Sequence, residues 1–125
     1  MEIKEQKFFP LLEEYRKHFK VTNETIFAYC DTIYVNGELP ADLLIHEQTH
    51  LDRQNKLGAD SWVKLYLTDK SFRRNEELLA YRAQLKSIKN KELKNKIRIE
   101  SARNLSSPLY KLDLTYDEAW KLLKV

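Results

Sequence analysis

Apolar residues recur at helical spacing near the N-terminus of the chain. Phe8, Leu12, Tyr15 and Phe19 lie three or four residues apart around Pro10. This spacing places the four side chains on one face of a helix. We therefore predict a first helix that ends at about Phe19.

The pattern changes between Thr25 and Val35, where β-branched and aromatic residues predominate. Such residues favour strands, and Asp31 interrupts the segment near its middle. Asn36-Gly37 then has the composition of a turn. The segment predicts two short strands, arranged as a hairpin.

A second helix is expected from about Pro40 to Lys56. Proline suits the first turn of a helix, because the N–H that it lacks would have no partner there. Gly58 provides the C-terminal stop, since glycine readily adopts the left-handed conformation that ends many helices.

The remainder of the chain predicts further helices. Asp60 or Ser61 can cap a short helix that carries Trp62, Leu65 and Tyr66. A longer helix is expected from about Lys70, with apolar spacing at Phe72, Leu79, Ala83 and Leu85, and another helix carries Leu93 and Ile97. The pattern breaks at Ser106-Ser107-Pro108. The capping box Thr115-x-x-Glu118 then opens a last helix that carries Trp120, Leu122 and Leu123. The expected fold class is α+β, mainly helical, with a short sheet or hairpin beside the helices.

Length and composition indicate a single domain over residues 1–125, since glycine and proline are scarce and no repeat occurs. Cys30 is the only cysteine, which excludes an intramolecular disulfide and a cysteine-rich zinc ribbon. The N-terminal residues lack the apolar core of a signal peptide, and no stretch approaches the roughly 20 apolar residues of a membrane span. We expect a cytoplasmic protein with no membrane partner.

The net charge of +3 is small against a charged fraction of 33%, so composition does not predict a nucleic-acid partner. The densest basic stretch, Lys86 to Arg98, has no interleaved aromatic residue for base stacking. It is interpreted as a solvated helix face. A DNA-associated protease, for which this stretch would be the contact surface, is an alternative. No feature predicts an oligomeric state.

His46-Glu47-Gln48-Thr49-His50 forms an HExxH motif inside the helix expected from Pro40. Residues four apart on a helix share a face, so His46 and His50 can hold one zinc ion. Glu47 is rotated by about 100° from His46 and can activate the attacking water, whose pKa zinc lowers to roughly 7. The same pentapeptide also arises by chance on ordinary amphipathic helices.

A catalytic zinc site needs a third protein ligand. His18 is the only other histidine and lies upstream without a partner one turn away, so we interpret it as a surface or packing residue. Glu76 and Glu77 occur in the middle of a later helix. Glu77 is favoured, because Ala80 at i+3 would allow close helix approach and Tyr81 at i+4 could support the site.

Together these features resemble the gluzincin metallopeptidases, and most closely the minimal gluzincin-like proteins encoded by bacteriophages and prophages. The likeness covers roughly Thr25 to Trp120. It is carried by His46 to His50 with Gln54, Trp62 to Asp69, Phe72-Arg73, Glu77 to Gln84, and Leu105 to Tyr110.

The resemblance implies a zinc metallopeptidase with His46, His50 and Glu77 as ligands and Glu47 as the general base. It also implies an edge strand beside the active-site helix, able to pair with an extended polypeptide substrate. Tyr110, Tyr81 and Tyr66 are candidate oxyanion donors, although packing explains each of them as well. The alternative function is a metal-stabilised, non-catalytic binding or assembly protein.

Overall fold

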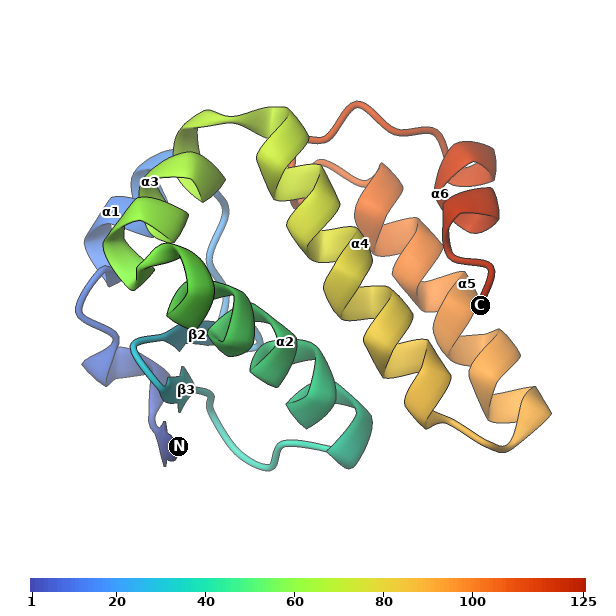
Figure 1. Ribbon diagram of the computed structural model, residues 1–125, viewed down its shortest axis with the longest axis horizontal. Helices are drawn as coiled ribbons and strands as arrows, with labels where there is room; N and C mark the ends of the chain where they lie inside the picture. The colour runs from blue at the N-terminus through green and yellow to red at the C-terminus, as the bar shows by residue number, and fades with distance from the viewer.

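The computed structural model describes all residues from Met1 to Val125 and has a mainly helical α+β fold, as predicted. Three short strands and six α-helices follow one another along the chain, with one 3-10 helix between β1 and α1 (Figure 1). Their bounds are β1 Glu2–Lys4, η1 Gln6–Phe8, α1 Leu12–His18, β2 Phe27–Tyr29, β3 Thr32–Tyr34, α2 Ala41–Leu57, α3 Ala59–Thr68, α4 Lys70–Ser87, α5 Lys91–Ser106 and α6 Tyr116–Leu122.

The predicted hairpin is confirmed as β2 and β3, which pair antiparallel with Ala28 opposite Ile33. Cys30 and Asp31 form its two-residue turn, both with positive φ (49° and 64°), as a tight hairpin turn requires. The sequence did not indicate β1. This strand adds parallel to β3, and the sheet order β1-β3-β2 leaves β2 at one edge.

The first helix is shorter than predicted. It begins at Leu12, and the chain before Pro10 forms the separate turn η1. Phe8 is 59% exposed, whereas its neighbour Phe9 is buried against Phe27 with stacked rings 4.3 Å apart. The helical spacing that included Phe8 was therefore misleading, because a break at Pro10 places Phe9 in the core instead.

The predicted ends of the later helices are largely confirmed. Gly58 ends α2 with φ of 86°, and Thr115 caps α6 through a complete capping box with Glu118. The expected cap of α3 by Asp60 or Ser61 is wrong, since the N-cap is Gly58 and no side chain caps this end. Asp60 instead accepts a hydrogen bond of 2.7 Å from the Tyr29 hydroxyl.

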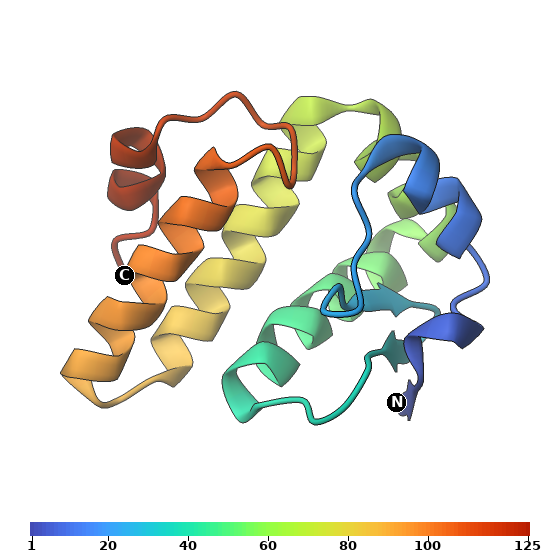
Figure 2. The same cartoon turned by 180° about the vertical axis from the view of Figure 1, so that it is seen from behind.

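The two larger of three apolar cores lie on either side of the α2–α4 pair. The sheet, α1 and α3 surround one core, which contains Phe9, Tyr15, Phe27, Tyr34, Trp62, Val63 and Tyr66. Helices α4, α5 and α6 enclose the other, around Leu85 and Leu105. In both views α2 and α4 lie side by side across the middle of the molecule (Figures 1 and 2). Polar groups on the facing sides of these two helices thus lie between the two larger apolar cores.

Some apolar positions predicted along the later helices face solvent. Leu79 is 44% exposed and Leu122 is 41% exposed, while Ala80 and Leu123 beside them are fully buried. The apolar face of α4 is thus shifted by one position at Leu79, whereas of the two leucines expected at the end of α6 only Leu123 is buried. No helix combines the length and apolar character needed to cross a membrane.

Candidate metal centre

Helix α2 presents His46, Glu47 and His50 to the interior, with exposed fractions between 4% and 6%. The two histidines are one turn apart, and their rings meet edge to face with centroids 5.0 Å apart. Ionisable groups are seldom this deeply buried unless they are paired or bind a ligand. The helix predicted from the positions of Pro40 and Gly58 therefore places the motif inward.

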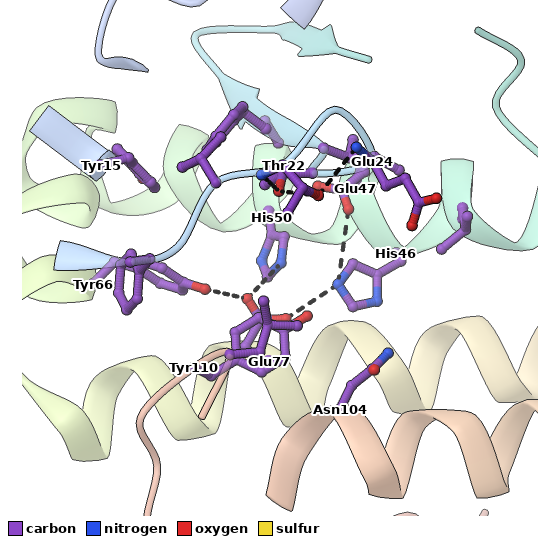
Figure 3. A pocket seen from close by; sticks show the side chains of 18 of the residues that line it. Tyr15, Thr22, Glu24, His46, Glu47, His50, Tyr66, Glu77, Asn104 and Tyr110 are labelled. Carbon is purple, nitrogen blue, oxygen red and sulfur yellow. Dashed lines mark hydrogen bonds and ion pairs between the residues drawn. The ribbon is translucent and has the colours of Figure 1, made fainter. Parts of the chain in front are cut away.

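Glu77 reaches the two histidines from α4. Its Oε1 atom lies 3.2 Å from His46 Nε2, and its Oε2 atom lies 3.3 Å from His50 Nε2 (Figure 3). One ligand atom from each of these residues lies within 4.8 Å of the others. The structure therefore brings together the three residues proposed from the sequence as zinc ligands.

The donor set fits a tetrahedral metal ion. With bonds of about 2.0–2.1 Å, neighbouring ligand atoms of tetrahedral zinc lie roughly 3.3–3.4 Å apart. Each histidine faces a different carboxylate oxygen of Glu77, at 3.2 Å for His46 and 3.3 Å for His50, and each of these separations is close to this spacing. Two imidazoles and one carboxylate also leave the fourth position to water or substrate, as in catalytic rather than structural zinc sites.

A hydrogen-bonded chain fixes the orientation of the His46 ring. Asp42 Oδ2 accepts from Gln84 Nε2 at 2.7 Å, and Gln84 Oε1 lies 3.0 Å from His46 Nδ1. Because the Gln84 amide nitrogen already donates to Asp42, its carbonyl oxygen must accept a proton from His46 Nδ1. His46 Nε2 is thereby left with a lone pair directed at Glu77 and the candidate metal position.

The ring of His50 is held by packing. It lies against Trp62 and Tyr66, at centroid distances of 5.3 and 6.4 Å. Its Nδ1 atom is buried and has no hydrogen-bond partner in the protein. Of the two histidines, only His46 has its tautomer set by a protein side chain.

Glu77 is held in its charged form. Burial alone would raise the pKa of Glu77, but the adjacent imidazoles, chiefly His50 through its charge, lower it well below the usual value. The Tyr66 hydroxyl also donates to Glu77 Oε2 at 2.6 Å. Burial and the adjacent Glu77 charge raise the pKa of Tyr66, so this hydroxyl remains a donor. A carboxylate, the form that binds metals, is therefore favoured at position 77.

The pKa of Glu47 is shifted in the opposite direction from that of Glu77. Burial raises its pKa to about 7, an effect that His46 partly offsets and Glu77 reinforces. Its Oε2 atom lies 3.8 Å from His46 Nε2, beside the candidate metal position rather than among the three ligand atoms. A carboxyl group with a pKa near neutrality is suited to accept and return a proton.

The neighbouring Glu76 has a different role. It is 1% exposed and receives hydrogen bonds from Arg53 Nε at 3.0 Å and from Trp62 Nε1 at 2.7 Å. These partners belong to α2 and α3, so Glu76 links three helices. Glu76 is therefore a buried link between helices, not a solvated residue of the helix surface.

The three candidate ligands and Glu47 line a cavity of about 390 Å³. Its remaining wall comes from aromatic residues, from α5 and the segment after it, and from the loop between α1 and β2, where Lys20, Val21, Thr22 and Glu24 lie. Gln6 fixes this loop, because its buried amide donates to the carbonyl oxygens of Thr22 and Thr25, each at 2.7 Å. Figure 2 shows the loop crossing in front of α2.

The other residues considered from the sequence lie away from this centre. His18 is partly exposed and pairs with Glu14 at 3.7 Å. The basic stretch from Lys86 to Arg98 is mostly exposed, and Arg98 stacks on Trp120, 3.7 Å from the ring centroid. Asp42 and Gln84 were not recognised as site residues, although Asp42 precedes His46 by one helical turn and Gln84 follows Glu77 by two.

Comparison of the chain with protein-family models, curated proteins and solved structures gave no match. The interpretation of the centre therefore depends on its own geometry and donor chemistry.

The Asp42–Gln84–His46 chain gives a first testable prediction. Replacing Gln84 with leucine removes the acceptor for the buried His46 Nδ1–H, and we expect zinc affinity to fall by about 10–100-fold. Competition with a chromophoric chelator measures this change. Gln48→Leu is the matched control, because Gln48 is an exposed glutamine on α2, the helix that carries His46. Equal affinities for the parent protein and Gln84→Leu would show that this chain does not support the ligand.

Proposed function

We propose that the protein is a zinc metallopeptidase. The observation that carries the proposal is the convergence of the His46, His50 and Glu77 ligand atoms beside a buried carboxyl group, Glu47, in one cavity. Carboxylate and imidazole ligands with one open position are typical of catalytic zinc in peptidases. The gluzincin-like, phage-type resemblance of the sequence points the same way.

In this proposal zinc supplies a positive charge that acidifies water and polarises the scissile carbonyl group. Glu47 accepts a proton from the attacking water as the water oxygen bonds to the carbonyl carbon. The carboxylic acid then returns the proton to the amide nitrogen as the C–N bond breaks. His46, His50 and Glu77 hold the ion in place, and Gln84 and Tyr66 orient two of these ligands.

The proposed substrate is an extended polypeptide. The edge strand β2 contacts α2 beside the centre, but Gln54 already bonds the Ala28 carbonyl of this strand at 2.7 Å and the N–H of Cys30, in the turn that follows, at 3.2 Å. A peptide added to this edge would therefore pair with the Ile26 end of the strand, which lines the cavity. A cytoplasmic location, the host cytoplasm for a phage-encoded protein, belongs to the same proposal and rests on the single free cysteine.

A metal-stabilised assembly protein is the second candidate function. The links from α4 to α2 through Glu77 and Glu76 support it, since both would hold the two helices together without turnover. Glu47 distinguishes the two functions. A purely structural ion needs no buried carboxyl group beside its ligands, whereas hydrolysis needs a base in this position.

The test is metal loading of the purified protein. We expect one zinc ion per chain and a higher unfolding temperature, because binding at about 100 times the dissociation constant stabilises the folded state by about 2.7 kcal/mol. Zinc-loaded protein should cleave a denatured protein substrate, detected by mass spectrometry. Protein stripped by chelation should not cleave it, and adding zinc back should restore cleavage. Tight zinc binding without cleavage would favour the assembly protein.

A further inference from the structure

Two tyrosine hydroxyls meet at the wall of the cavity. Tyr81 Oη and Tyr110 Oη are 2.7 Å apart, and Asn104 Nδ2 donates to Tyr81 Oη at 3.4 Å. All three residues line the cavity that contains the candidate metal centre. The Tyr81 ring also packs edge to face on His46, with centroids 4.4 Å apart. The hydroxyl pair is thus placed beside the metal ligands by residues of α4, α5 and the segment that follows α5.

The donors and acceptors of this group set the direction of its hydrogen bonds. Tyr81 is 5% exposed, so leaving its hydroxyl proton without an acceptor would cost about 1–3 kcal/mol. Asn104 Nδ2 can only donate, and the remaining partner of Tyr81 Oη is Tyr110 Oη. The arrangement that gives the buried Tyr81 proton an acceptor therefore has Tyr81 donating to Tyr110. The proton of Tyr110 is then free to point into the cavity.

The ordinary pKa of a tyrosine hydroxyl is about 10, so both hydroxyls are protonated at neutral pH. A protonated hydroxyl with a free O–H is the kind of group that stabilises an oxygen gaining negative charge. Tyr66, the third tyrosine considered from the sequence, has already donated its proton to Glu77. Of these three residues, only Tyr110 has a proton available for a ligand.

We propose that Tyr110 is a catalytic hydrogen-bond donor to the substrate carbonyl oxygen, and that Tyr81 is the positioning residue that turns the Tyr110 proton into the cavity. This inference rests on the proposed peptidase function. In this inference Asn104 helps to direct the Tyr81 proton toward Tyr110, because its amide N–H donates to the Tyr81 oxygen.

The test uses one substitution to reverse the direction of the hydrogen bond between Tyr81 and Tyr110. In Asn104→Asp the new carboxylate accepts the Tyr81 proton, so Tyr81 must accept from Tyr110 and the Tyr110 proton turns away from the cavity. We expect Asn104→Asp and Tyr110→Phe each to lower kcat by about 100-fold, the usual loss of one oxyanion donor, with little change in KM. Asn104→Leu, which adds no acceptor, should lose far less.

A double variant separates this effect from the added charge. In the Tyr81→Phe background no hydroxyl links position 104 to Tyr110, so Asn104→Asp should cause no further loss. Binding provides a second readout. The zinc-loaded protein is titrated calorimetrically with an alanine-flanked phosphinic pseudopeptide, whose tetrahedral oxygens imitate the reacting carbonyl. Tyr110→Phe and Asn104→Asp should both weaken this binding at unchanged zinc content.

The outcomes distinguish this inference from the peptidase proposal. A parent protein that cleaves peptides, with Tyr110→Phe equally active, would overturn the inference and leave the peptidase function standing. Equal losses in Asn104→Leu and Asn104→Asp would overturn the directed chain in favour of a packing role. An inactive parent whose pseudopeptide binding still depends on Tyr110 would instead contradict the peptidase function and support the Tyr110 hydrogen bond.

Discussion

Replacing Glu47 with glutamine is expected to leave zinc binding intact and to lower peptide hydrolysis by about 10²–10⁴-fold. Glutamine keeps the size and hydrogen-bonding capacity of the side chain, so the buried position beside His46 can be filled without a cavity. The amide cannot accept a proton from water at neutral pH. In the proposed mechanism this removes the base while the three zinc ligands stay in place.

The measurement compares kcat/KM for a denatured protein or fluorogenic peptide at equal zinc content. Glu38→Gln is the matched control, because it removes the same charge from an exposed residue away from the cavity. We expect this control to match the parent. Undiminished zinc-dependent turnover in Glu47→Gln would remove Glu47 from the mechanism, whereas loss of zinc from this variant would show that Glu47 helps to hold the metal.

The parts of the site that could be predicted depend on neighbours in the sequence. Pro40 and Gly58 define the helix that carries the motif, and the four-residue spacing places His46 and His50 on one face. Glu77 could be chosen because Ala80 and Tyr81 follow it at helical spacing, and both are buried with it. In each case the signal is periodicity within one helix.

The environment of Glu76 could not be predicted in this way. Its partners, Arg53 and Trp62, belong to two other helices, and their approach depends on how α2, α3 and α4 pack together. Strand β1 is a similar case. Its three residues are exposed and have no strand-like alternation of burial, and the strand exists because β3, about thirty residues later, offers a free edge. Long-range pairing of this kind leaves little trace in local composition.

Asp42 and Gln84, which support His46, were only partly predictable from the sequence. Asp42 and Gln84 have suitable spacings, one turn before His46 and two turns after Glu77. The spacing alone does not show that the two side chains bond to each other, because they lie on different helices. Sequence periodicity could therefore suggest both residues, but only the packing of α2 on α4 joins them to His46.

The environments of Glu76 and Glu77 predict two different losses when each residue is changed to alanine. Glu77→Ala removes a proposed ligand, and we expect zinc affinity to fall by more than about 100-fold, beyond the range typical of supporting residues. Glu76→Ala leaves zinc affinity little changed but separates Arg53 and Trp62 from their acceptor. Because Arg53 is partly solvated, we expect the metal-free protein to lose about 2 kcal/mol of unfolding free energy, less than for a fully buried pair.

Two measurements on the same variants separate these effects. Chelator competition gives the zinc affinity, and urea unfolding of the metal-free proteins gives the stability. Glu100→Ala, an exposed glutamate on α5, is the control and should change neither. Only Glu77→Ala should lose zinc affinity, because the carboxylate of Glu76 is already bound by Arg53 and Trp62 and cannot also reach the histidines. Loss of zinc affinity in Glu76→Ala alone would move the ligand to Glu76 and require α4 to rotate by about 100° from the position described here.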